Sequence, residues 1–181
     1  MCQGHLSLVD DHPICVRRLS KDEIPLAFPL LREAGRCDSL QSWKDYAAVY
    51  VAGSADGAWP SGIIVAEQAS RCIVGLFSFV VRPCLRLGRV LAAGDLTIMA
   101  PFGREEIAAH LLASIGDIAR RYGVRETEIE LAKGAAWCAA LLGRQGYCLD
   151  DRRQIVWRRT MDGAAARLSS KPKPSKPNVS P

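Results

Sequence analysis

Two side chains in this sequence are candidates for proton transfer in a reaction. Asp95 is a carboxylic acid beside Gly94 in the strand-like segment 89–99, and Tyr147 is a phenol that follows Gly146. A carboxylate can take a proton from a nucleophile, and a phenol can give one to a leaving group. Each side chain also has a structural interpretation. Asp95 would then be a solvated acid at a strand edge, and Tyr147 a core aromatic residue with a hydrated hydroxyl.

Other combinations of reactive residues are weaker. Glu128 and Glu130 alternate along segment 127–131, which is typical of a solvated strand face, although that face could instead line a cleft. His110 falls on the polar side of a helical segment, where we expect solvent exposure. No Ser-His-Asp or Cys-His arrangement can be assembled. The seven cysteines are odd in number and lack C-x-x-C spacing, so we expect neither a disulfide framework nor a metal site.

The charge of the chain says little about its partners. The formal net charge is +5, and four of these charges lie after Gly163, where there is no acid. The rest of the chain is therefore close to neutral and has no basic stripe interleaved with aromatic residues, so we expect no specific nucleic-acid partner. Lysines spaced by prolines would give only non-specific, salt-sensitive contacts. The four charged residues are Arg167, Lys171, Lys173 and Lys176.

The length of the chain, 181 residues, fits one domain. We expect a loose leader over 1–12, a folded domain over 13–162, and a disordered tail rich in Lys, Pro and Ser over 163–181. No apolar run approaches the roughly 20 residues that a membrane span needs, and the first residues lack the apolar segment of a signal peptide. These observations predict a cytoplasmic protein with no membrane partner.

The elements that position the candidate residues begin with a strand over 14–19. Ser20 and Glu23 form the sequence of a capping box for a helix that ends near Glu33. A second helix is predicted over 39–52, where aromatic and small residues recur at helical spacing. Three strands over 63–67, 73–81 and 89–99 are predicted to form an antiparallel meander. The recurring residues of the second helix are Trp43, Tyr46, Ala47 and Tyr50.

The second half of the chain alternates helices and strands. A long helix is predicted over 104–122, then a strand over 127–131, a helix over 135–142 and a strand over 154–159. One face of the long helix is apolar, with Ile107, Leu111, Ile115, Ile118 and Tyr122. The order β-α-α-β-β-β-α-β-α-β predicts an α/β fold with a mixed central sheet, because a strand–helix–strand unit requires a parallel crossover.

Three segments in this order resemble the GNAT N-acetyltransferase family. The hairpin from Ile64-Val65-Ala66-Glu67 to Ile73-Val74-Gly75-Leu76 is similar to a family hairpin. Segment 96–112 resembles motif A, and segment 135–147 resembles motif B, with Gly146-Tyr147 in place of Gly-Phe. The resemblance covers roughly residues 14–159 and implies a GNAT-like mixed sheet.

Motif A implies a site for acetyl-CoA as co-substrate. The family pattern Arg/Gln-x-x-Gly-x-Gly/Ala is matched here by Arg104-Glu105-Glu106-Ile107-Ala108-Ala109, with isoleucine in place of the first glycine. Two carboxylates stabilise a first helical turn but would repel a diphosphate bound there. The resemblance assigns the following residues to cofactor binding: Ile98, Met99, Ala100, Gly103, Arg104, Ile107, Ala108 and Ala109.

The resemblance also implies an activity. A primary amine would attack acetyl-CoA directly, with Asp95 as the candidate base and Tyr147 as the candidate acid, since Leu142 stands where the family often has tyrosine. The acceptor would be a small or protein amine. Because motif A is altered, a non-catalytic binding or regulatory protein is the alternative.

The acceptor would lie against the first two helices and the loop that follows them. Trp43, Tyr46, Tyr50 and Trp59 in that region either line a pocket or simply pack. A homodimer is left open.

Overall fold

The computed structural model shows how these segments assemble. It describes residues 14–52, 60–68, 71–101, 103–131, 135–150 and 153–160. The expected leader and tail, and Trp59, lie outside the described residues.

A seven-stranded sheet in the order β1-β2-β3-β4-β5-β7-β6 forms the centre of the molecule. Only the β4–β5 pair is parallel, and all other neighbours are antiparallel. The predicted mixed sheet is therefore confirmed, with β6 as an element that the sequence did not predict. The strands are β1 (Cys15–Arg18), β2 (Ser61–Glu67), β3 (Ile73–Cys84), β4 (Gly88–Ile98), β5 (Glu126–Glu130), β6 (Cys148–Asp150) and β7 (Arg153–Thr160).

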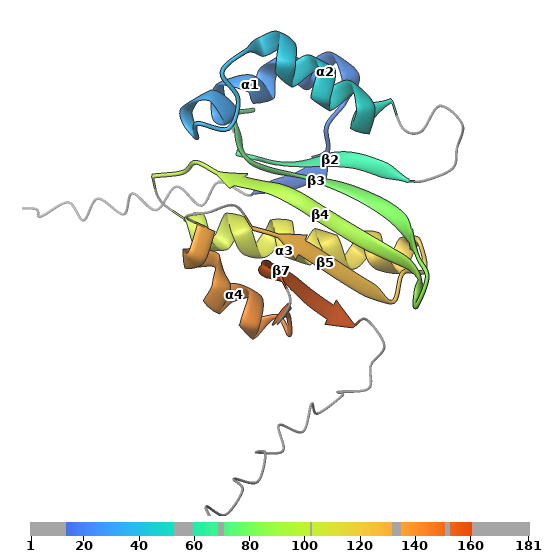
Figure 1. The fold of residues 1–181 in the computed structure, drawn as a ribbon. Coiled ribbons are helices and arrows are strands. Elements are labelled where there is room, and N and C mark those ends of the chain that lie inside the picture. Colours follow the sequence, from blue (N-terminus) through green and yellow to red (C-terminus); the bar gives the residue numbers. More distant parts are fainter. Residues whose placement is uncertain are drawn as a thin grey trace, which may run out of the picture.

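Helices cover both faces of the sheet (Figure 1). On one face lie α1 (Ile24–Glu33) and α2 (Leu40–Val51); on the other lie α3 (Arg104–Arg121) and α4 (Ala139–Arg144). Short 3₁₀ turns precede α1 and α4, at Lys21–Glu23 and Ala135–Cys138. No helix in the described part of the chain is long and apolar enough to span a membrane.

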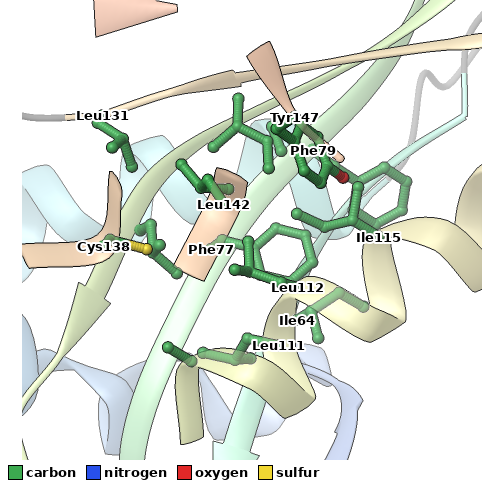
Figure 2. Packing of buried hydrophobic residues seen from close by; sticks show 14 of the residues in the cluster. Ile64, Phe77, Phe79, Leu111, Leu112, Ile115, Leu131, Cys138, Leu142 and Tyr147 are labelled. Carbon is green, nitrogen blue, oxygen red and sulfur yellow. The ribbon is translucent and has the colours of Figure 1, made fainter. Parts of the chain in front are cut away.

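The core has two parts, one on each face. Under α3, the residues Ile107, Leu111, Leu112 and Ile115 pack with side chains of the sheet such as Phe77 (Figure 2). These helix positions are spaced by three or four residues, so a single face of α3 is buried. Under α1 and α2, a second cluster includes Leu31, Trp43, Ile63 and Leu76.

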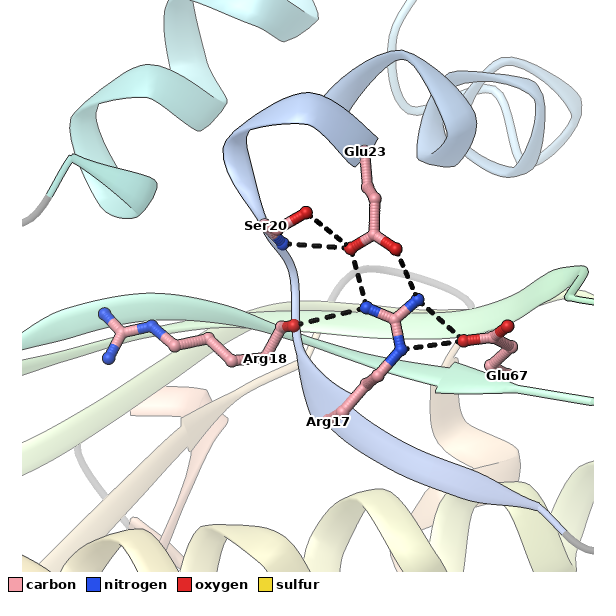
Figure 3. A network of polar contacts seen from close by, with 5 residues as sticks. All are labelled: Arg17, Arg18, Ser20, Glu23 and Glu67. Atoms are coloured by element: carbon pink, nitrogen blue, oxygen red, sulfur yellow. Dashed lines mark hydrogen bonds and ion pairs between the residues drawn. The ribbon is translucent and has the colours of Figure 1, made fainter.

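An ion-pair network fastens the start of α1 to the sheet (Figure 3). Arg17 of β1 donates to both carboxylate oxygens of Glu23, at 2.6 and 2.8 Å, and to Glu67 of β2 at 2.7 Å. Glu23 also accepts from the Ser20 amide at 3.2 Å and the Ser20 hydroxyl at 2.7 Å. The hydrogen bonds from Arg17, followed by those from Ser20, lower the pKa of Glu23 to about 2.

This network predicts an acid-sensitive contribution to stability. Glu23→Gln is expected to lower the free energy of unfolding by about 1 kcal/mol at pH 7. A carboxylate whose pKa is lower in the folded state stabilises the fold above its unfolded pKa, and this contribution is lost as pH falls toward the folded value. The difference between wild type and variant in urea unfolding should thus shrink between pH 4.5 and pH 2. Glu33→Gln, at an exposed position of α1, is the control.

Candidate active site

Strand β4 loses its partner on one side partway along its length. It runs to Ile98, but its parallel pairing with β5 covers only Val90 to Ala93. Beyond Ala93 the described residues of the two strands do not pair, so this edge of β4 is open. Backbone groups along a strand point alternately to its two sides. Because the Met99 amide donates to the Val74 carbonyl of β3 at 2.9 Å, the Ile98 amide points to the open edge and the Met99 amide does not.

A bulge in β4 places Asp95 where this opening begins. Gly94 pairs with Ser78 and Thr97 with Leu76, so two residues of β4 oppose the one residue of β3 between them. Asp95 is one of the two and has φ of 57°. Aspartate is among the few non-glycine residues that adopt this left-handed conformation. A bulge redirects the side chain that it carries, and here the carboxylate points to the α1–α2 face.

Polar groups from α2, from β3 and from the segment between α1 and α2 surround this carboxylate. The Tyr46 hydroxyl of α2 donates to Asp95 Oδ2 at 2.5 Å, and the Ser78 hydroxyl of β3 lies 3.0 Å from the same oxygen. An Arg36 guanidinium nitrogen lies 3.7 Å from Oδ1. Asp95 is therefore oriented by its neighbours and is not simply a solvated acid, although 47% of its side chain is exposed.

The Tyr46 phenol remains a neutral donor at ordinary pH. Burial, followed by its hydrogen bond to Asp95, raises the pKa of Tyr46 well above its usual value. The ring also contacts Trp43 and Tyr50, with centroids 5.9 and 4.9 Å away. The phenol therefore supplies a fixed hydrogen bond to the carboxylate.

A cavity of about 380 Å³ lies between the sheet and the α1–α2 pair, with Asp95 in its wall. Tyr46, Ser78 and Arg36 also line it, and its remaining walls are mostly apolar. The sequence left open whether the aromatic residues of α2 line a pocket or simply pack. Trp43 and Tyr46 line the cavity, whereas Tyr50 packs against Tyr46. The apolar wall contains Leu31, Trp43, Ile63 and Leu76.

The N-terminus of α3 offers a second binding feature. Gly103 is the N-cap of the helix, with φ of 69°, and no side-chain capping hydrogen bond is present there among the described residues. The Ile107 amide donates to the Gly103 carbonyl at 3.0 Å, which is the first backbone hydrogen bond of the helix. The amides of residues 104–106 come before it and therefore have no carbonyl partner within the helix. Such amides and the helix dipole favour an anion. Glu106 lies close by, because a methyl group on Gly103 would be 3.8 Å from its Oε2 atom.

The structure places the residues of motif A in different environments. Ile107 and Ala108 are fully buried, and a methyl group on Gly75 would lie 3.2 Å from Ile107 Cγ2. Their side chains face the core, so we leave both out of the candidate site. Arg104 is exposed, with its guanidinium 3.9 Å from the centre of the Trp137 ring. Ala100 and Ala109 are partly buried at the edge of the core.

Tyr147 does not join Asp95. Its side chain is 2% exposed and lies in the core on the α3 face, near Phe79 and Leu142 (Figure 2). Asp95 faces the opposite side of the sheet. The interpretation of Tyr147 as a core aromatic residue is therefore confirmed, and its hydroxyl is buried as well. Burial raises the pKa of this phenol.

The predicted solvated face of β5 is wrong for Glu128 and holds for Glu130. Glu128 is 8% exposed and lies 2.5 Å from Arg82 of β3. Glu126 is also buried, 3.9 Å from Arg86. Glu130 and His110 are exposed, as expected for His110.

Sequence analysis missed two residues of the candidate site, Arg36 and Ser78. What marks them as site residues is that they lie close to Asp95, and this closeness can be seen only in the folded structure. The described residues contain no cluster that could hold a metal ion.

Comparisons with known proteins agree with this architecture. No protein-family model matches the sequence. No curated protein matches it significantly either. Many solved structures do match in shape.

Three of these structures define the fold. The PaiA N-acetyltransferase of Thermoplasma acidophilum, in complex with coenzyme A, is 14% identical with a TM-score of 0.55, covering 82% of this chain and 99% of that one. A GNAT-family acetyltransferase of Staphylococcus aureus Mu50 is 8% identical with a TM-score of 0.61, at the same coverage. The yncA protein of Salmonella typhimurium, with its cofactor acetyl-CoA, is 13% identical with a TM-score of 0.61, covering 84% and 96%. The chain therefore has the GNAT fold.

Proposed function

We propose that this protein is an acetyl-CoA-dependent N-acetyltransferase that acts on a primary amine. One observation carries the proposal: a single stretch of chain presents three groups that such a reaction uses. Asp95 lies at the cavity, the Ile98 amide faces the open edge of β4, and the uncapped start of α3 follows within a few residues. The solved structures of the same fold that carry coenzyme A or acetyl-CoA support this choice of co-substrate.

The backbone groups at the start of α3 suit a diphosphate, while the carboxylates of Glu105 and Glu106 oppose it. Free amides and the positive end of an 18-residue helix favour an anion. Gly103 leaves the approach to these amides free of a β-carbon. Arg104 and Arg144 add positive charge nearby, the latter 3.5 Å from Glu105.

In the proposed reaction, Asp95 accepts a proton from the substrate ammonium, so that the neutral nitrogen can attack. Acetyl-CoA supplies the acetyl group: a C–N bond forms as the thioester C–S bond breaks, and the sulfur leaves with the electron pair. The nitrogen then loses its second proton to water, and the thiolate takes a proton. Tyr46 and Ser78 hold the carboxylate through hydrogen bonds. The Ile98 amide points to the side where negative charge would develop, and donors of this kind stabilise such charge.

No protein acid is needed for the leaving group in this proposal. The thiol of cysteine has a pKa of about 8.5, so the thiolate is a weak enough base to leave without being protonated first. It can then take its proton from water. Leu142 cannot donate a proton, and Tyr147 does not line the cavity. We therefore assign Asp95 as the only side chain that transfers a proton in the proposed reaction.

The first test is whether acetyl-CoA binds and reacts. Binding to the native state must raise Tm, since ligand at about 100 times its Kd stabilises a protein by about 2.7 kcal/mol. Release of free thiol in the presence of a panel of primary amines then measures transfer. No shift at millimolar acetyl-CoA would refute the proposal, and a shift without transfer to any amine would favour the non-catalytic binding protein.

Glu106 provides a more local test of the diphosphate site. Glu106→Gln is expected to tighten acetyl-CoA binding about fivefold, or about 1 kcal/mol, because it removes a negative charge beside the free amides. Glu105→Gln should have a smaller effect, because the Glu105 side chain is 77% exposed and lies near Arg144. Calorimetric Kd values check this result. Equal affinities for wild type and Glu106→Gln would mean that the diphosphate does not sit at this helix start.

A further inference from the structure

Opposite charges meet in the wall of the cavity. Arg36 follows the end of α1, where its amide donates to the Leu31 carbonyl at 2.8 Å and the preceding Gly35 has φ of 63°. This helix ending fixes the origin of the Arg36 side chain beside the sheet. Its guanidinium approaches Asp95 only to 3.7 Å, and the two side chains are 32% and 47% exposed. The pair is therefore loose, and both groups retain the capacity to bind a ligand.

The cavity is small, and apart from three hydroxyl groups the rest of its described wall is apolar. Its volume of about 380 Å³ is near the lower end of the range for small-molecule sites, which is about 300–1,000 Å³. Leu31, Ile63 and Leu76 in its wall are each less than 5% exposed. Among the described residues that line it, Asp95 is the only carboxylate, so these residues offer a diamine one anionic partner and not two.

We propose that the acceptor is a free α-amino acid with an apolar side chain, an inference that rests on the proposed acetyl transfer. Its ammonium would bind Asp95 and its carboxylate Arg36, since a guanidinium forms paired hydrogen bonds with a carboxylate. These two ligand groups are attached to one carbon, which suits protein charges that are 3.7 Å apart. The ligand side chain would lie against Leu31, Ile63 and Leu76. A protein N-terminus has no such carboxylate and would leave Arg36 without a partner from the ligand.

Direct binding of three ligands to the full chain tests this inference. L-leucine, leucinamide and 4-methylpentanoate share one apolar body and differ in the charged groups that they retain. Titration calorimetry, with and without saturating coenzyme A, is expected to show leucine binding at least tenfold more tightly than either analogue. Leucinamide binding as tightly as leucine, or no binding of leucine, would overturn the inference.

Variants assign the carboxylate to Arg36. Arg36→Ala is expected to weaken leucine binding at least tenfold and leucinamide binding less than twofold. Arg32→Ala is the control, because Arg32 lies on α1 over the Phe28 ring, 5.8 Å from its centre, and does not line the cavity. If Arg36→Ala weakens both ligands equally, the arginine does not read a carboxylate and the inference fails.

The thermal shift with acetyl-CoA separates this inference from the proposed function. A protein that acetyl-CoA stabilises but that does not bind leucine keeps the proposed transferase function and loses the amino-acid acceptor. A protein that binds leucine through Arg36 but is not stabilised by acetyl-CoA would have an amino-acid site without the proposed reaction, so the inferred acceptor role would fail with the transferase function.

Discussion

Replacing Asp95 with asparagine is expected to lower kcat for acetyl transfer about 100- to 10,000-fold, the range for loss of a general base. Asparagine has the same shape and can also adopt the left-handed conformation found at this position, so the bulge should persist. It can still accept the Tyr46 hydrogen bond, but it cannot take a proton from an ammonium. The rate of thiol release with and without a reactive amine measures the effect.

The acetyl-CoA-induced rise in Tm should be the same in Asp95→Asn as in wild type, because the diphosphate site lies at α3. Asp45→Asn is the matched control: it removes the same charge from α2, where Asp45 accepts from Gln41 at 2.8 Å and does not line the cavity. A variant at position 95 that keeps more than half of the wild-type kcat would show that Asp95 is not the base.

The order of the elements could be predicted from local signals. Apolar spacing predicted α2 and α3 to within one or two residues, and Gly123 after α3 has the positive φ expected of a helix stop. The three-residue β6 was missed because so short a strand has too few positions to show alternation. The parallel step from β4 to β5 followed from the intervening long helix.

The site was predictable only in part. Asp95 could be singled out as an acid in a central strand, but its bulge depends on pairing with β3, which a sequence pattern does not display. Tyr46 precedes it by 49 positions and Arg36 by 59, and neither belongs to a local motif. Side chains brought together by tertiary packing become visible as a site only when the sheet and helices are assembled.

Ile107 was subject to two conflicting predictions. The motif that begins at Arg104 assigns it to the position of a phosphate-binding glycine, whereas its spacing from Leu111 and Ile115 assigns it to the core face of the helix. Its full burial beside Gly75 agrees with the second. Periodicity was the better guide here, because the buried face of an 18-residue helix is fixed by many contacts, while a degenerate motif can be aligned one residue out of register.

Glycine at position 107 is therefore expected to destabilise the fold and not to improve the cofactor site. Ile107→Gly should lower the free energy of unfolding by about 3–6 kcal/mol, from the cavity left by a deleted core side chain and about 1 kcal/mol for glycine within a helix. Urea unfolding measures the loss, and Ala113→Gly at an exposed position of the same helix measures the helix contribution alone. If Ile107→Gly were as stable as Ala113→Gly and bound acetyl-CoA more tightly than wild type, the isoleucine would be an obstacle in the phosphate site. Because the Ile107 side chain is buried between α3 and the sheet and fills space in the core, we expect a less stable variant and no gain in acetyl-CoA affinity.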